Sequence, residues 1–307
     1  MNNNNIFEKR VRPWDGIGTP VMQANSWEEV MELAGLDWNV RQEDVYAGEG
    51  IRVPGYKANI KDDDNTVLGV VSTKYNLVQH SEAYAFLDEL FKQGARFDCA
   101  GVLQAGKRTW VSMKLSNYII NGERHVGYLL ITNSFDGSSS LRISVVPVRV
   151  LCANTISLAL KKAQRTWALT HSASVNEKLE AAKEVLLHAD AYMESLGKEI
   201  EWFNKKIIPE EEAMSIIDEL MPITDDMSQV QRNNTTKLRN DIKYRYRYAP
   251  DLVGMNNTAY RLYNAISDHA FHSEPLRRTE NYKESLFIKA IDGNPLLDKA
   301  YEMIKAA

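Results

Sequence analysis

The sequence predicts an α+β protein in which an antiparallel β-meander is flanked by helices and followed by a mostly helical C-terminal region with one long helix. Apolar and polar residues alternate over short segments in the first half of the chain, and after about residue 173 the apolar residues recur at helical spacing. With 307 residues, 44% of them hydrophobic, the chain can bury a substantial core. We expect an N-terminal arm with one short helix (1–64), an α+β meander core (65–172) and a helical C-terminal region (173–307).

Four segments are expected to form the meander, at 97–103, 109–115, 125–132 and 140–151. In the second, Val111 and Met113 alternate with Trp110 and Ser112, which is the period of a sheet with one covered face. The turns between these strands contain glycines, which accept positive φ at no steric cost: Gly106, Gly122 and Gly137. A further strand is expected at 67–72, after a turn at 62–65.

Helices are expected on both sides of the meander. In the arm, Ser26 and Glu29 form a capping box for a short helix that ends at Gly35. A second helix is expected to begin at Ser81 and to run to about Phe91. Later helices are predicted at 154–163, 174–203, 210–220, 228–248, 258–271 and 295–304.

The helix at 174–203 carries an apolar seam with alternating three- and four-residue spacing, over roughly four heptads. The seam consists of Leu179, Ala182, Leu186, Ala189, Met193, Leu196, Ile200 and Phe203. The preferred interpretation is a long helix that lies across its own domain. The alternative is a homo-oligomer that associates through the helix 174–203.

Composition and missing motifs limit the classes of function. No apolar segment approaches the roughly 20 residues that a bilayer requires, and no signal sequence is recognised, so we expect a cytoplasmic protein without a membrane partner. The two cysteines, Cys99 and Cys152, do not suffice for a disulfide framework. Phosphate-binding loops, dinucleotide-binding glycine motifs, nucleophile elbows and zinc-binding helices are not recognised either. We therefore expect no cofactor and assign no catalytic residue.

The net charge of −4 argues against an overall electrostatic attraction to nucleic acid, but it allows a local basic groove. Cationic side chains neutralise phosphates and aromatic rings stack on unpaired bases, which suits single-stranded nucleic acid. The residues expected to bind it are Lys107, Arg108, Arg142, Arg149, Lys161, Lys162, Arg165, Trp167, Lys243, Tyr244, Arg245, Tyr246 and Arg247. Arg142 and Arg149 point to opposite faces of a regular strand unless a bulge near Pro147 resets the alternation. For the stretch 243–247, a solvated helix surface is the alternative.

Asp268, His269 and His272 are the nearest approach to a metal site, because residues three and four apart share one face of a helix. The alternative is that they are structural hydrogen-bonding groups. No metal is assigned on this pattern alone.

A series of motifs resembles, in the same order, a family described as phage/plasmid-like proteins of unknown function. These motifs are Trp14–Gly18, Ala34–Trp38, Leu68–Ser72 with Tyr75 and Gln79, Asn133–Ser138, Leu151–Thr155, Arg165 with Thr170–His171, and Thr258–Tyr260 with Asn264–Ala265 and Asp268–His269. Phe135 stands where that family commonly has histidine, and Thr170–His171 reverses its usual order. The resemblance implies a bacteriophage, prophage or plasmid gene that acts in a bacterial cytoplasm, and it transfers no catalytic residue.

Three functional hypotheses follow. The first is a single-stranded DNA-binding or strand-annealing protein that acts as an oligomer in recombination or replication. It rests on the basic and aromatic segments, on the apolar seam, and on a helix–meander–helix order that is broadly similar to the core of the Rad52-like annealing proteins. The second is an interaction protein that inhibits or modulates a host defence or other host complex. The third is a metal-dependent nucleic-acid enzyme.

Overall fold

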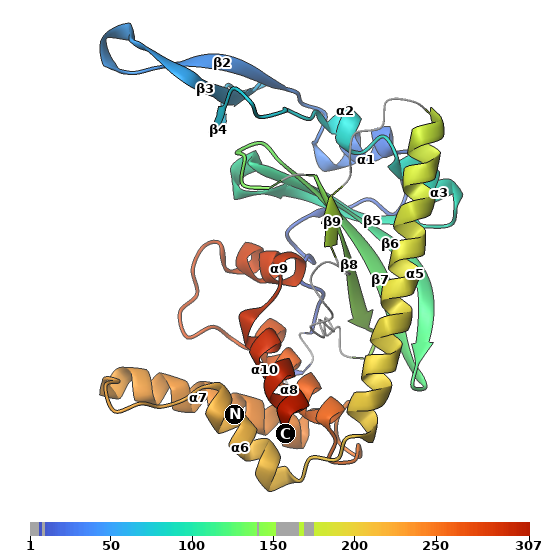
Figure 1. The fold of residues 1–307 in the computed structure, drawn as a ribbon, viewed down its shortest axis with the longest axis vertical. Coiled ribbons are helices and arrows are strands. Elements are labelled where there is room, and N and C mark those ends of the chain that lie inside the picture. Colours follow the sequence, from blue (N-terminus) through green and yellow to red (C-terminus); the bar gives the residue numbers. More distant parts are fainter. Residues whose placement is uncertain (1–5, 8–9, 140, 152–165, 169–174) are drawn as a thin grey trace.

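The computed structural model describes residues 6–7, 10–139, 141–151, 166–168 and 175–307. It confirms the α+β class, because antiparallel sheets form much of the N-terminal half and helices form the C-terminal region (Figure 1). Several predictions lie outside the described residues. They concern the helix expected at 154–163, the start of the helix expected at 174, and the side chains of Cys152, Lys161, Lys162, Arg165 and His171.

The main sheet has six antiparallel strands in the order β1-β5-β6-β7-β8-β9. Their bounds are β1 Thr19–Pro20, β5 Arg96–Leu103, β6 Arg108–Ile120, β7 Glu123–Ser134, β8 Arg142–Arg149 and β9 Thr166–Ala168. Consecutive strands from β5 to β8 are neighbours, so the predicted meander is confirmed. The expected turn glycines Gly106, Gly122 and Gly137 all have positive φ.

Both faces of this sheet are covered, whereas the alternation in β6 predicted one covered face. Val111 and Met113 belong to the larger hydrophobic core, on the side of α5 (Val175–Lys205). Trp110 on the opposite face packs with Trp14 of the N-terminal segment and with Phe287 of α9 (Tyr282–Asp292). The prediction was wrong because α9 was not expected and because a single strand does not show which distant segments return to cover it.

A second sheet, in the order β2-β3-β4, projects from the body (Figure 1). Its strands are β2 Val40–Tyr46, β3 Arg52–Lys61 and β4 Val67–Ser72. The sequence predicts β4, but the two preceding strands lie in the segment expected to be an irregular arm. Of the β2 residues only Val40 is buried, so this strand carries no apolar alternation that would reveal it.

Of the two N-caps predicted for the short helices, one is confirmed and the other is wrong. α1 (Trp27–Ala34) begins at the N-cap Ser26, whose side chain accepts from the Glu29 amide, and it ends at Gly35. The helix expected from Ser81 to Phe91 is instead two helices, α2 (His80–Ala83) and α3 (Leu87–Lys92). Gln79 rather than Ser81 caps the first, in a capping box with Glu82.

The C-terminal helices follow the prediction closely: α6 Glu210–Leu220, α7 Gln229–Tyr248, α8 Ala259–His272 and α10 Pro295–Ala306. The long helix α5 lies along one face of the main sheet (Figure 1). Its seam residues Ala182, Ala189, Leu196, Ile200 and Phe203 are buried in the larger core. These five seam residues therefore pack inside their own chain, in agreement with the preferred interpretation of a helix that lies across its own domain. Among the described helices, none combines the length and the apolar character that a bilayer crossing requires.

Candidate functional site

The structure separates the residues expected to bind nucleic acid into distinct locations. Arg149 lies at the end of β8, and Arg245 and Tyr246 lie on α7, and all three are almost completely buried. Their burial removes them from any surface that a nucleic acid could contact. β8 pairs with β7 in continuous register through Pro147, so no bulge places Arg149 on the same face as Arg142.

Arg149 and Arg245 belong to a buried ion cluster that joins the main sheet, the N-terminal segment and the C-terminal helices. Its members are Arg10, Arg149, Arg245, Glu123, Asp241, Asp251 and Asp268. Arg10 bridges Asp251 and Asp268 at 2.6 and 2.7 Å. Arg149 bridges Glu123 and Asp251, with both pairs at 2.5 Å. These arginines therefore form ion pairs inside the fold and are not available to bind nucleic acid.

The pKa values in the buried ion cluster agree with its charged state. Burial alone would raise the pKa of Asp251, but Arg10 and Arg149 outweigh it and hold that pKa below its ordinary value. Burial would likewise lower the pKa of Arg10, and the carboxylates of Asp268 and Asp251 raise it instead. Charged partners in a low-dielectric interior are favourable only when they remain together. We regard this cluster as structural.

Of the three residues considered for a metal site, Asp268 and His269 are bound to other side chains and His272 is buried. Asp268 accepts hydrogen bonds from Arg10 and Arg245, and His269 Nδ1 lies 2.6 Å from Asp241. Burial lowers the pKa of His272 to about 4, and its Nε2 has no hydrogen-bond partner. Within the described parts of the chain, no three side chains of suitable type are placed to hold a metal ion. The spacing of Asp268, His269 and His272 therefore does not translate into a metal site.

The two other α7 cations expected to bind nucleic acid, Lys243 and Arg247, are paired with acidic side chains. Lys243 lies 2.7 Å from Asp218, and Arg247 lies 2.7 Å from Glu210 on α6. Tyr244 stacks on Phe7 and contacts Tyr248. Lys243, Tyr244 and Arg247 thus lie on a partly neutralised helix surface, whereas Arg245 and Tyr246 of the same stretch are buried.

Two of the expected residues, Arg108 and Arg142, do come together, at the end of the main sheet where β6 and β8 begin. Asp292, at the C-terminal end of α9, accepts from Arg142 at 3.0 Å and from Arg108 at 3.4 Å. One carboxylate is thereby shared between two guanidinium groups. Lys107 precedes Arg108, is exposed and forms no ion pair with any described residue. β9, which contains Trp167, pairs with the start of β8, so its backbone lies at the same end of the sheet.

A tyrosine, Tyr75, also lies at this end of the main sheet. Tyr75 is half-buried, and its hydroxyl donates to the carbonyl of Ser134, the residue paired with Arg108 across β6 and β7. Burial, and after it the charge of Asp136, raises the pKa of this hydroxyl, so the ring stays neutral at physiological pH. We call Tyr75, Lys107, Arg108, Arg142 and Asp292 the sheet-end site.

Sequence reasoning missed two members of the sheet-end site. Tyr75 stands out in the sequence only within a family motif, together with Gln79, and nothing in its local sequence pairs it with Ser134. Asp292 lies 184 and 150 residues from its two arginine partners, and α9 was not predicted. Such contacts depend on the tertiary fold and leave no local signal.

Comparison with known proteins identifies a family whose function is unknown. No curated protein and no solved structure matches the chain. A family model described as a domain of unknown function, DUF932, matches residues 67–290. This match covers the main sheet from β5 onward, β4, the long helix and the C-terminal helices through most of α9. The chain therefore belongs to the DUF932 family.

Proposed function

We propose that the protein binds single-stranded DNA at the sheet-end site, in the service of strand annealing during recombination or replication of a phage or plasmid. The observation that carries the proposal is the shared carboxylate of Asp292. Two arginines share this one carboxylate and Lys107 precedes one of them in sequence, so the sheet-end site itself has more cations than carboxylates, with Asp136 and Glu284 as further acidic residues at its edge. A surplus of cations on an acidic protein marks a local place for a polyanion.

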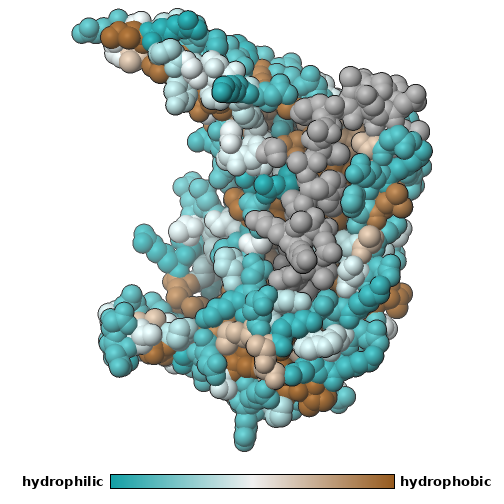
Figure 2. Space-filling model, viewed as in Figure 1, coloured by the Kyte–Doolittle hydropathy of each residue, from teal (hydrophilic) through white to brown (hydrophobic). Residues whose placement is uncertain are grey.

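The surroundings of the sheet-end site suit an unpaired strand better than a duplex. The Tyr75 hydroxyl binds the strand residue that pairs with Arg108, so its ring lies at the same end of the sheet, and bases stack on such rings only when they are unpaired. The surface is hollowed between the projecting small sheet and the C-terminal helices (Figure 2), and the sheet-end site lies on the body between these parts.

Fluorescence anisotropy with a labelled single-stranded oligonucleotide tests this proposal. We expect binding at low salt that weakens linearly with the logarithm of salt concentration. The variant Lys107→Ala/Arg142→Ala should bind more weakly, with a salt slope smaller by about 1 for each phosphate that the protein no longer neutralises. Asp292 keeps Arg108 as a partner in this variant, so the fold should persist.

The matched control is Lys198→Ala/Arg247→Ala, which also removes one lysine and one arginine, both exposed and distant from the sheet-end site. Its affinity should equal that of the unmodified protein. A loss of affinity in this control alone would show that the DNA interface lies in the helical region. No binding at low salt would rule out the DNA proposal altogether.

A second function, recognition of a host protein, is favoured by the small sheet. Tyr56 pairs with Ser72 and Ala58 pairs with Val70, so these residues share the face turned away from Gly69 and Asn59, which contact the body. Tyr56 and Val70 are each about half exposed, and Tyr46 and Ile51 near the hairpin end are more exposed still. Exposed apolar side chains on a projecting element are typical of interaction surfaces.

A variant of the small sheet distinguishes DNA binding from recognition of a host protein. The variant Tyr56→Ser/Val70→Ser should bind the oligonucleotide normally, because the sheet-end site is unchanged. If the small sheet recognises a host protein, in-cell crosslinking should recover a defined partner with the unmodified chain and fail to recover it with this variant. Recovery of the same partner with both chains would exclude this face.

A further inference from the structure

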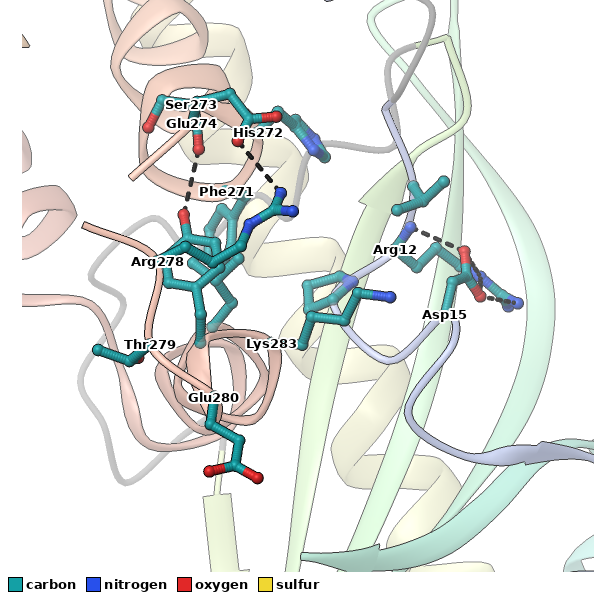
Figure 3. A pocket seen from close by; sticks show the side chains of 14 residues that line it. Arg12, Asp15, Phe271, His272, Ser273, Glu274, Arg278, Thr279, Glu280 and Lys283 are labelled. Carbon is teal, nitrogen blue, oxygen red and sulfur yellow. Dashed lines mark hydrogen bonds and ion pairs between the residues drawn. The ribbon is translucent and has the colours of Figure 1, made fainter. Parts of the chain in front are cut away.

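A second concave site lies at the other end of α9, between the N-terminal segment and the connection from α8 to α9 (Figure 3). Its volume is about 420 Å³, within the range of roughly 300–1,000 Å³ that small-molecule sites occupy. Val11, Pro13, Phe271 and Leu286 supply apolar surface. This cavity can therefore enclose the body of a small organic molecule.

Most of the charges around the cavity are already paired. Asp15 accepts hydrogen bonds from the guanidinium and the backbone amide of Arg12, which also donates to Asp98. Glu274 pairs with Arg278 at 3.2 Å. These pairs neutralise the walls, so they do not by themselves select a charged ligand.

Two charged lining residues, Lys283 and Glu280, form no ion pair with any residue that the structure describes. Figure 3 shows Lys283 extending from α9 toward the segment that carries Arg12 and Asp15, whereas the carboxylate of Glu280 points away. A Cβ on Gly16 would lie 3.1 Å from Nζ, so the ammonium sits close against the backbone of that segment. One uncompensated cation thus faces the cavity.

His272 adds a polar group without a partner. His272 is one of the residues that line the cavity, and its Nε2, on the side of Asp268 and Arg10, is shielded from solvent and makes no hydrogen bond. The first residues of α9, Tyr282 and Lys283, also line the cavity, and Asn281 provides no side-chain cap there, although the Tyr282 amide donates to the Thr279 carbonyl. Buried polar groups normally have partners, so an unpartnered one beside a cavity indicates a ligand that supplies the missing hydrogen bond.

We propose that this cavity binds a small phosphate monoester with an aromatic or aliphatic body, with Lys283 holding the phosphate and the apolar walls enclosing the body. An ammonium is a compact charge suited to phosphate, and uncapped amides at a helix N-terminus favour the same anion. The neutral imidazole of His272 completes the polar end of the site. The proposal concerns residues separate from the sheet-end site and does not depend on DNA binding.

Isothermal titration calorimetry with phenyl phosphate as the probe tests the proposal. We expect saturable one-to-one binding that becomes at least tenfold weaker in Lys283→Gln. The control Lys289→Gln changes a lysine on the same helix that does not line the cavity, and it should bind normally. Equal binding by all three proteins, or no binding by the unmodified protein, overturns the proposal.

Three further probes resolve the chemistry. Phenol should bind at least tenfold more weakly than phenyl phosphate, because it lacks the anion, and equal binding would overturn the role of Lys283. Inorganic phosphate should also bind more weakly, and equal binding would overturn the role of the apolar walls. Benzoate binding as tightly as phenyl phosphate would overturn the choice of phosphate. The variant Lys107→Ala/Arg142→Ala should bind phenyl phosphate normally, so failure of the two proposals can be told apart.

Discussion

Arg149 donates to the carboxylate of Asp251 at 2.5 Å, and this hydrogen bond ties the last residue of β8 to the segment that follows α7. Both side chains are buried, and Asp251 also pairs with Arg10 of the N-terminal segment. Three parts of the chain that are distant in sequence therefore meet at one carboxylate. Removing a charge here leaves its partners desolvated and uncompensated, which costs far more than the removal of a surface pair.

The variant Asp251→Ala should lower the free energy of unfolding by about 3–5 kcal/mol, because it leaves two buried arginines without this carboxylate. The matched control Glu201→Ala removes an acidic residue from an exposed pair with Lys205 and should cost less than about 1 kcal/mol. Urea denaturation followed by circular dichroism measures both values. A loss of stability for Asp251→Ala as small as that of the control would show that the buried ion cluster does not stabilise the fold.

Arg245 and Arg247 are neighbours on α7 with opposite environments. Arg245 is buried between Asp241 and Asp268, whereas Arg247 is about half exposed beside Glu210. Arg245→Ala should destabilise the protein by about 3–5 kcal/mol, and Arg247→Ala by less than about 1 kcal/mol. Thermal and urea unfolding of the two variants give the comparison. Similar destabilisation in both would contradict the assignment of Arg245 to the interior.

These environments explain why the sequence predicted the elements better than the site. Local periodicity and caps identify the strands β5 to β8 and the helices α6 to α8, because those signals lie within each element. The sequence shows that Arg245 is positively charged, but it does not show whether the side chain faces solvent or Asp268. Only the tertiary fold decides this, since Asp268 lies on another helix. Asp292 and Tyr75 reach the sheet-end site through equally distant contacts.

His80 should make stability depend on pH. Its ring lies among Trp38, Tyr84 and Phe135, neither nitrogen has a hydrogen-bond partner, and burial lowers its pKa to about 4. Between pH 6.5 and 4 the unfolded chain takes up a proton here and the folded chain does not. Stability from this group is therefore fully present above about pH 6.5 and falls by about 1.4 kcal/mol per pH unit as the pH drops through that window.

The variant His80→Phe keeps an aromatic ring and removes the titration. Urea unfolding at about pH 7.5 and at about pH 5 should show a smaller decrease of stability on acidification in this variant than in the unmodified protein. His272, whose pKa is also lowered to about 4, remains in both proteins and cancels in the comparison. Parallel pH profiles would mean that His80 is not buried in its neutral form.

Gly69 of β4 controls how the small sheet meets the main sheet. A Cβ at this position would lie 2.6 Å from the Cα of Asp136, which belongs to the turn after β7. Because the atom in the way is backbone, the turn or β4 must move, and overpacking of this kind costs about 1–3 kcal/mol. Gly69→Ala should therefore destabilise the protein and also weaken DNA binding, since the displaced turn follows Ser134, the partner of Tyr75. Gly48→Ala is the control, because a Cβ there meets nothing within 4 Å and the residue does not have positive φ. Urea unfolding and oligonucleotide anisotropy are measured on both variants. Equal stability and affinity in the two would show that β4 can shift away from the turn without consequence. Lower stability of Gly69→Ala with unchanged affinity would show that the turn does not contribute to DNA binding at the sheet-end site.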